Sequence, residues 1–108
     1  MNSSTLVMPS RIATEVKEAP SAADQLIQQG LRTWEQGRPE EALLLFRRAV
    51  GADLRRPEPW YWIGCLKEEG GDKISAAYCY YLAHDIRRYG PAREALKRLG
   101  YMRGEDGG

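Results

Sequence analysis

The sequence matches itself when it is shifted by 34 residues, and this period limits the folds that the chain can adopt. A period of about 20–50 residues is typical of proteins in which one supersecondary unit stacks on the next. The period therefore predicts two copies of one unit, residues 23–56 and 57–90. Six aligned positions pair a small residue with a small one or a large apolar or aromatic residue with another: Leu26 with Trp60, Gly30 with Gly64, Gly37 with Gly71, Ala42 with Ala76, Phe46 with Tyr80, and Ala49 with Ala83.

Apolar residues within each unit have the spacing of a helix. Leu26, Ile27, Gly30, Leu31 and Trp34 recur at intervals of three and four residues, which places them on one side of a helix. No segment shows the strict alternation of a half-buried strand between turn residues. The sequence therefore predicts an all-α fold.

Glycine and proline predict where the helices end. Gly37 and Pro39 lie between the first two helices, and Gly70-Gly71-Asp72 lies between the third and fourth. Residues 51–59 contain one glycine and two prolines, so we expect a loop there. A last helix is expected at residues 91–100. The chain is thus predicted to form two antiparallel helical hairpins and a C-terminal capping helix.

Both ends of the chain lack helical periodicity. Residues 1–20 combine turn-forming residues with one short apolar cluster, Leu6-Val7-Met8, and contain no apolar core of the kind that a secretory signal carries. Residues 102–108 are polar and rich in glycine. We therefore expect a helical domain at residues 21–101 between a flexible N-terminal arm and a flexible tail.

Small residues recur where two helices of a hairpin would approach closely. We expect Gly30 and Gly64 to face Ala42 and Ala76 across each hairpin, because only small side chains allow a close approach. We expect Phe46 and Tyr80 to fill the gap that widens between the two helices of a hairpin. We expect Ala49 and Ala83 to let the next hairpin pack closely.

This pattern resembles the tetratricopeptide repeat family, whose 34-residue unit places glycine, alanine and aromatic residues at these positions. The resemblance covers the two units and the capping helix, about three quarters of the chain. The second unit is also loosely similar to the repeats of type III secretion chaperones. The chain departs from the family pattern at three kinds of position. Thr33 and Lys67 replace the second aromatic, and Gln29 replaces the leucine of the first unit. Leu54 and Arg88 stand where the family usually has proline.

The resemblance implies that the first helix of each hairpin lines a concave groove that binds a peptide or helix of a partner protein. Ile27 and Tyr61 occupy the lysine positions of the family's clamp for a terminal carboxylate, so that clamp is absent. An apolar segment or an amphipathic helix is the expected ligand, and an adaptor or chaperone is the implied role. The residues placed in the groove by the resemblance are Ile27, Leu31, Trp34, Tyr61, Trp62 and Cys65, with Glu68 and Glu69 at its end.

Two questions stay open at this point. Three consecutive bulky aromatics, Trp60, Tyr61 and Trp62, cannot all face one side of a helix. Trp62 therefore either contributes to partner binding or packs on the N-terminal arm or the capping helix. Two repeats are also fewer than the three that such folds usually need. Either the arm and the capping helix complete the core, or a partner protein or second copy of the chain does.

Other functional classes receive less support from the sequence. Sixteen Lys and Arg against fifteen Asp and Glu give a net charge of +1, which does not favour strong non-specific binding of nucleic acid. RNA binding is the alternative that we keep, because the C-terminal end is locally basic. The residues that make it basic are Arg87, Arg88, Arg93, Lys97, Arg98 and Arg103.

Catalytic and metal-binding patterns are not found in the sequence. The single histidine, His84, lacks a partner at catalytic or ligand spacing, so we expect neither an enzyme nor a cofactor nor a metal site. No apolar run approaches the roughly 20 residues of a membrane span. Cys65 and Cys79 lack CxxC spacing, so we expect two buried free thiols and a reducing, cytosolic setting.

Overall fold

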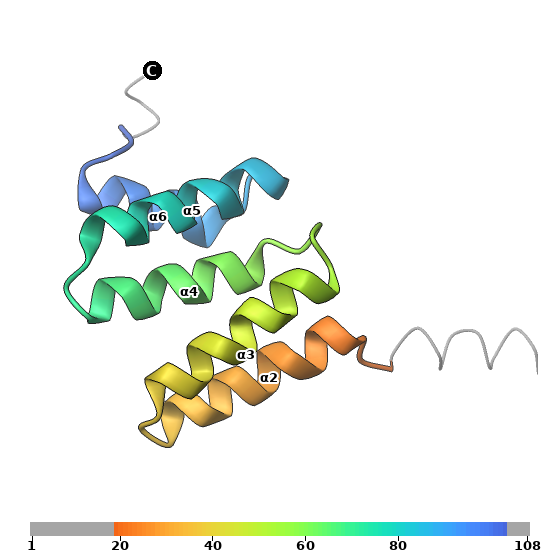
Figure 1. Ribbon diagram of the computed structural model, residues 1–108. Coiled ribbons are helices and arrows are strands. Elements are labelled where there is room, and N and C mark those ends of the chain that lie inside the picture. The colour runs from red at the N-terminus through yellow and green to blue at the C-terminus, as the bar shows by residue number, and fades with distance from the viewer. Residues whose placement is uncertain (1–18, 104–108) are drawn as a thin grey trace, which may run out of the picture.

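The computed structural model describes residues 19–103, and this part of the chain is helical without any strand (Figure 1). The predicted all-α fold is confirmed. The predictions for residues 1–18 of the arm and 104–108 of the tail lie outside the described residues. The helices are α2 (Ala22–Glu35), α3 (Pro39–Ala52), α4 (Glu58–Glu69), α5 (Lys73–Arg87) and α6 (Gly90–Leu99).

Each helix packs against the next one along the chain. The main contacts join α2 to α3, α3 to α4, α4 to α5 and α5 to α6. Figure 1 shows the two hairpins, α2–α3 and α4–α5, stacked so that α4 lies between the first hairpin and α5, with α6 behind α5. The order of the helices along the chain therefore matches their order in the stack, and α6 covers the second hairpin.

Local chemistry sets the helix ends. The hydroxyl of Ser21 accepts a hydrogen bond from the backbone N–H of Asp24 at 3.1 Å, and the Asp24 carboxylate accepts one from the N–H of Ser21 at 3.2 Å. This capping box begins α2. The turn inside each hairpin contains a glycine with positive φ, 83° at Gly37 and 89° at Gly71. Only glycine adopts this left-handed conformation without strain, so both turns depend on it.

The loop between the hairpins is shorter than we predicted. The structure extends α3 to Ala52 and begins α4 at Glu58, whereas the sequence predicted a loop at residues 51–59. Pro59 does not exclude a helix there, because the N–H groups of the first turn have no acceptor within the helix. Gly51 lies in the last turn of α3 and is exposed, so its low helix propensity is tolerated.

An aromatic ring packs against a glycine in each hairpin. A β-carbon at Gly30 would lie 2.5 Å from Cε1 of Phe46, and one at Gly64 would lie 2.6 Å from Cε1 of Tyr80. Both rings are fully buried. Each glycine therefore makes room for the ring of the facing helix.

The closest neighbour of each glycine is the aromatic ring rather than the alanine that we expected to face it. The side-chain atoms nearest to each glycine belong to the aromatic ring, although Ala42 and Ala76 are themselves fully buried in the hairpin cores. The ring lies one helical turn beyond the alanine, and at that level the two helices are close enough for it to reach the glycine backbone.

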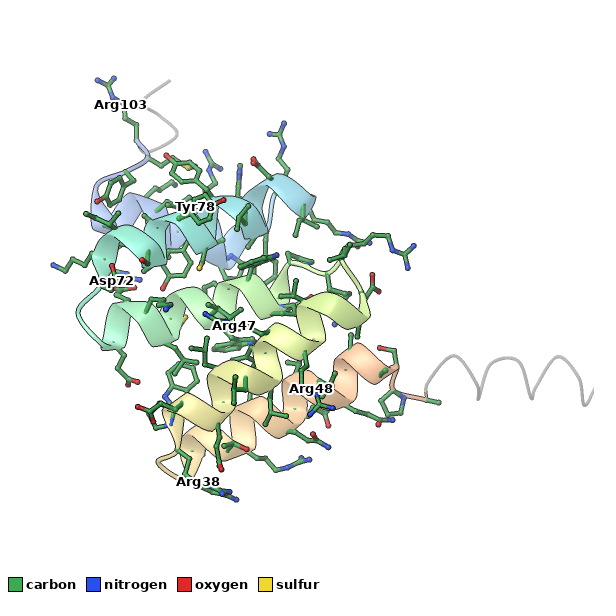
Figure 2. All side chains as sticks on the ribbon, in the orientation of Figure 1. Arg38, Arg47, Arg48, Asp72, Tyr78 and Arg103 are labelled. Atoms are coloured by element: carbon green, nitrogen blue, oxygen red, sulfur yellow. The ribbon has the colours of Figure 1, made fainter. Side chains whose placement is uncertain are left out.

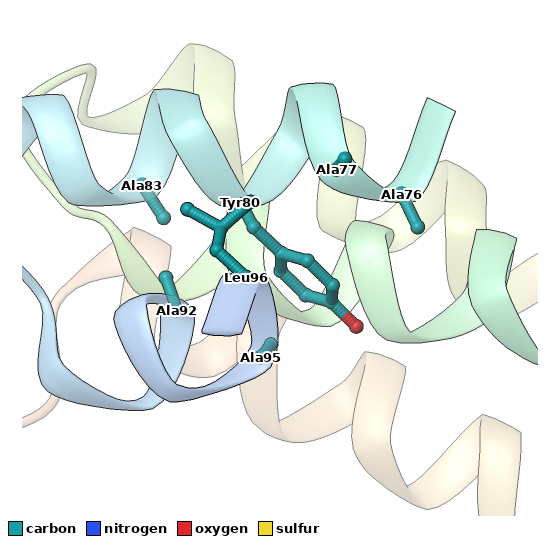
Figure 3. Close-up of a cluster of buried hydrophobic side chains, with 7 residues drawn as sticks. All are labelled: Ala76, Ala77, Tyr80, Ala83, Ala92, Ala95 and Leu96. Atoms are coloured by element: carbon teal, nitrogen blue, oxygen red, sulfur yellow. The ribbon is translucent and has the colours of Figure 1, made fainter. Parts of the chain in front are cut away.

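A second core joins the last hairpin to α6. Tyr80 and Leu96 are its largest fully buried side chains, and alanines surround them (Figure 3). Small residues on both helices let α5 and α6 approach closely around the ring. The buried members of this cluster are Ala76, Ala77, Tyr80, Ala83, Ala92, Ala95 and Leu96. Ala49, the equivalent of Ala83, is fully buried in the first hairpin.

We expect Gly30→Ala to lower the free energy of unfolding by about 1–3 kcal/mol, because the new methyl group would overlap the buried ring of Phe46. Urea unfolding followed by circular dichroism measures this change. Gly51→Ala is the matched control, because a methyl group added there would meet no atom within 4 Å beyond its chain neighbours and the nearby backbone of its own helix. It should raise the free energy of unfolding by up to about 1 kcal/mol. A Gly30→Ala protein as stable as the wild type would contradict the ring-on-glycine contact.

Candidate protein-binding groove

Three open hollows follow one another across α2, α4 and α6, the first helices of successive hairpins and the capping helix. Their volumes are about 360, 350 and 360 Å³. Trp34 lines both the first and the second hollow, and Arg98 lines both the second and the third. The hollows therefore form one continuous surface, which we call the groove.

The first hollow is mainly apolar. Leu31, Trp34 and Trp62 line it, with Glu35 as its charged residue. The rings of Trp34 and Trp62 meet edge to face, with centroids 6.2 Å apart, and Trp34 also contacts the buried ring of Phe46 at 6.4 Å. These contacts hold both indoles in fixed orientations while leaving them half-buried. The hollow is thus a preformed apolar surface.

The second hollow is polar at its centre. The Tyr80 hydroxyl donates to Oε1 of Glu68 at 2.8 Å, and Arg98 donates from Nη1 to Oε2 at 2.5 Å and from Nη2 to Oε1 at 3.2 Å. The bidentate contact with Arg98 lowers the pKa of Glu68, and burial raises the pKa of Tyr80. Glu68 is therefore held as a carboxylate that binds α6 to the end of α4.

Another contact crosses from the first hairpin to the second. The indole N–H of Trp34 donates to Oε1 of Glu69 at 3.0 Å. Trp34 is half-buried and Glu69 is exposed at the end of α4. This bond fixes the position of the Trp34 ring at the border between the first two hollows.

The third hollow lies where α4 meets α6. Tyr61 lines it together with Ala95, Glu94 and Pro91. The Tyr61 ring lies 5.6 Å from the ring of Tyr89 and also contacts Tyr80 and Trp62, and burial raises its pKa to about 12. Tyr61 therefore acts mainly as packing between α4 and the start of α6.

The structure places seven of the eight residues assigned to the groove on the walls of these hollows. Binding of a partner there stays a prediction. Ile27 is the exception, because only 7% of its surface is exposed. Ile27, which the resemblance assigned to the groove, instead lies on the buried side of α2 with Ala23 and Gly30.

Trp62 packs on the first hairpin rather than on the capping helix. Its ring contacts in the described part of the chain are with Trp34 of α2 and the adjacent Tyr61. The N-terminal arm, the other surface considered for it, lies almost wholly outside the described residues. Trp62 therefore both holds the two hairpins together and lines the groove.

The sequence did not indicate the contribution of α6. Arg98, Glu94 and Pro91 line the groove but were not assigned to it. One signal was available for Ala95, because a further shift of 34 residues aligns it with Tyr61. Glu35 could have been found in the same way, since it aligns with Glu69.

The two thiols are free, and neither is a strong nucleophile. Cys79 is buried, as predicted, whereas Cys65 is half-buried and lies 3.6 Å from the Tyr80 hydroxyl. Burial raises the pKa of both thiols, so they are protonated at neutral pH. Both cysteines therefore contribute to the packing of the helices rather than to reactivity.

A larger hollow of about 400 Å³ lies between the start of α3 and the end of α4, and Glu69 lines both this hollow and the second hollow of the groove. Leu43 and Leu66 provide its apolar wall, and Glu40, Lys67 and Asp72 surround it. It contains none of the aromatic residues that line the groove.

Neither a metal site nor a membrane span is visible in residues 19–103. No group of three or more His, Cys, Asp or Glu in this range could hold a metal ion. No helix in the same range is long and apolar enough to cross a membrane.

Comparison with known proteins gives no match to this chain among protein-family models, curated proteins or solved structures. The resemblance to tetratricopeptide repeats therefore depends on the residues that recur at the 34-residue period.

We expect Glu68→Gln to lower the free energy of unfolding by about 1 kcal/mol at pH 7, a modest value because the Arg98 side chain is 58% exposed and water screens the pair. The folded-state pKa of Glu68 lies below its ordinary value of 4.5. Its contribution is therefore fully present above pH 4.5 and is lost as the pH falls through the lowered pKa. Urea unfolding at pH 7 and at pH 3 measures the difference, which should shrink at pH 3.

Glu41→Gln is the control for this experiment. Glu41 pairs with Arg38 on the surface of α3, and both side chains are more than half exposed. Its replacement should change stability by less than about 0.5 kcal/mol at either pH. Equal effects of the two replacements would show that the bond between Glu68 and Arg98 contributes no more to the free energy of unfolding than an exposed surface pair.

Proposed function

We propose that this protein is a non-catalytic interaction module whose groove binds an apolar or helical segment of another protein. The first hollow is the observation that carries the proposal. Leu31, Trp34 and Trp62 present half-buried apolar surface there, held in place by ring contacts and by the bond to Glu69. Preformed aromatic surface of this kind dominates the binding energy of many interfaces, because its side chains lose little freedom on binding.

The charges around the hollow favour a ligand that also carries Lys or Arg. Glu35 lines the first hollow, and Glu69 lies at its border with the second. Glu68 is already neutralised by Arg98. An amphipathic helix with a bulky apolar anchor and one or two neighbouring cations would match this surface, with the anchor between Leu31 and Trp62.

A binding surface of this type suits an adaptor or a chaperone that covers an exposed apolar segment of its partner. Burial of one large apolar side chain contributes about 1.5–3 kcal/mol, and association itself costs several kcal/mol, so micromolar affinity requires several such anchors together with the charge contacts.

RNA binding receives less support than protein binding. Two of the basic residues that suggested it have acidic neighbours: Arg98 pairs with Glu68, and Lys97 lies 3.4 Å from Glu94. These contacts reduce the local positive charge that a phosphate backbone requires. Retention on single-stranded RNA that weakens steeply with added salt would favour this alternative.

A peptide library displayed on phage and selected on the immobilised protein tests the proposal. We expect enrichment of sequences with apolar residues at i, i+3 or i+4, and i+7, together with Lys or Arg. Fluorescence polarisation of a selected peptide should then show at least about tenfold weaker binding to Leu31→Glu and Trp62→Ala, since each change removes an anchor contact. Circular dichroism should show that both variants remain helical.

Leu44→Glu is the matched control, because Leu44 is an exposed leucine on the outer face of α3 and lines none of the groove. It should bind the selected peptide as the wild type does. Selection without enrichment, or peptides that bind both groove variants at wild-type affinity, would place the binding surface elsewhere.

A further inference from the structure

The outer face of α5 exposes a row of large apolar residues, which we call the stripe. Ile74 is 76% exposed, Tyr78 is 66% exposed and Tyr81 is 39% exposed. Their spacing of four and three residues places them on one side of the helix, and Figure 2 labels Tyr78 on α5. The Tyr81 hydroxyl donates to the backbone carbonyl of Tyr101 at 2.8 Å, and the side chain of Tyr101 is 45% exposed.

The first hairpin provides an internal control for this surface. At the positions 34 residues earlier, α3 has Glu40, Leu44 and Arg47, all exposed. Two of these three residues are charged, so stacking of the hairpins does not require apolar residues on the outer face. The stripe on α5 therefore calls for a separate explanation. Contiguous apolar surface of this kind commonly marks an interaction site.

We propose that the stripe joins two copies of this chain through antiparallel packing of their α5 helices. Ile74 and Tyr81 lie on either side of Tyr78 at nearly equal distances along the helix. A two-fold axis beside Tyr78 would therefore bring Tyr78 against its own copy and Ile74 against the partner's Tyr81. Such an interface is self-complementary, as a two-fold dimer requires.

The charges at the two ends of α5 fit the same arrangement. Lys73 is exposed in the first turn, beside Ile74, and Asp85 is exposed near the end of the helix on the side of the stripe. In the antiparallel pair, Asp85 of each copy points toward the N-terminal turn of the partner's α5, where Lys73 attracts it. The carboxylate of Asp72, which caps that turn through the N–H of Ser75, opposes part of this attraction. A parallel pair would bring like charges together instead.

The stripe has a small area, and this limits the affinity of the dimer. It offers on the order of 300–400 Å² of apolar surface per copy, about half of what each partner buries in a standard interface. We therefore expect a weak, reversible dimer, with a Kd between about 10 µM and 1 mM.

Sedimentation equilibrium of the whole chain over a range of concentrations tests the dimer. The wild type should fit a monomer–dimer equilibrium. Tyr78→Arg should raise the Kd at least about thirtyfold, because it places two guanidinium groups beside the axis. Leu44→Arg, the equivalent change on α3, should leave the Kd within about twofold. Tyr78 is two-thirds exposed, so the variant should keep the wild-type helical circular dichroism.

Charge reversal tests the antiparallel register independently, at exposed positions that folding tolerates. Lys73→Glu and Asp85→Lys should each weaken the dimer by about three- to tenfold, and the double variant should recover most of the loss. A wild type that stays monomeric up to about 1 mM would overturn the proposal. So would equal weakening by Leu44→Arg, a wild-type Kd for Tyr78→Arg, or a monomer whose stripe binds only a foreign helix.

These experiments test the dimer proposal and the groove proposal independently. Trp62→Ala should leave the monomer–dimer equilibrium unchanged, and Tyr78→Arg should leave the affinity for a groove-selected peptide unchanged. A Trp62→Ala protein that keeps the wild-type helical circular dichroism but no longer dimerises would place the interface on the groove and overturn the stripe as the contact surface.

Discussion

The contact between an aromatic ring and a glycine in each hairpin determines how the helices of this protein are spaced. The ring of Phe46 lies against Gly30, and the ring of Tyr80 lies against Gly64, without room for a methyl group between them. The ring therefore limits how closely the two helices approach at that level. Because α6 packs on the same Tyr80 through Leu96, the position of the capping helix depends on the second of these contacts.

The two copies of this contact differ by one hydroxyl group, and the groove differs accordingly. Phe46 cannot donate a hydrogen bond, and the residue above it, Trp34, packs on its ring at 6.4 Å. Tyr80 can donate, and Glu68, the residue equivalent to Trp34, accepts its hydrogen bond at 2.8 Å. Glu68 then binds Arg98 of α6. The apolar section of the groove over the first hairpin and the charged section over the second therefore depend on two paired differences, Phe46 against Tyr80 and Trp34 against Glu68.

Features set by neighbouring residues could be predicted from the sequence, whereas features set by how the helices cross could not. The turn at Gly71 was predictable because a left-handed residue favours glycine. The burial of Ile27 was not, because a residue at the border of an apolar face turns inward or outward according to the neighbouring helix. The bond between Glu68 and Arg98 joins residues 30 positions apart, so only the packing of α6 on the second hairpin brings them together.

The proposed binding groove and the proposed dimer surface occupy different sides of the fold, and this separation has a functional consequence. The stripe residues Ile74, Tyr78 and Tyr81 line none of the three hollows. A dimer formed through α5 would therefore present two open grooves. A partner with two suitable segments would bind the second groove at an effective concentration set by the dimer, which can raise the overall affinity by about 10²–10⁴-fold. Such a partner would in turn stabilise the dimer, because binding across both copies favours the assembled state. The weak dimer and a groove of modest affinity would then act together, and a two-repeat chain would bind its partner tightly without a third repeat.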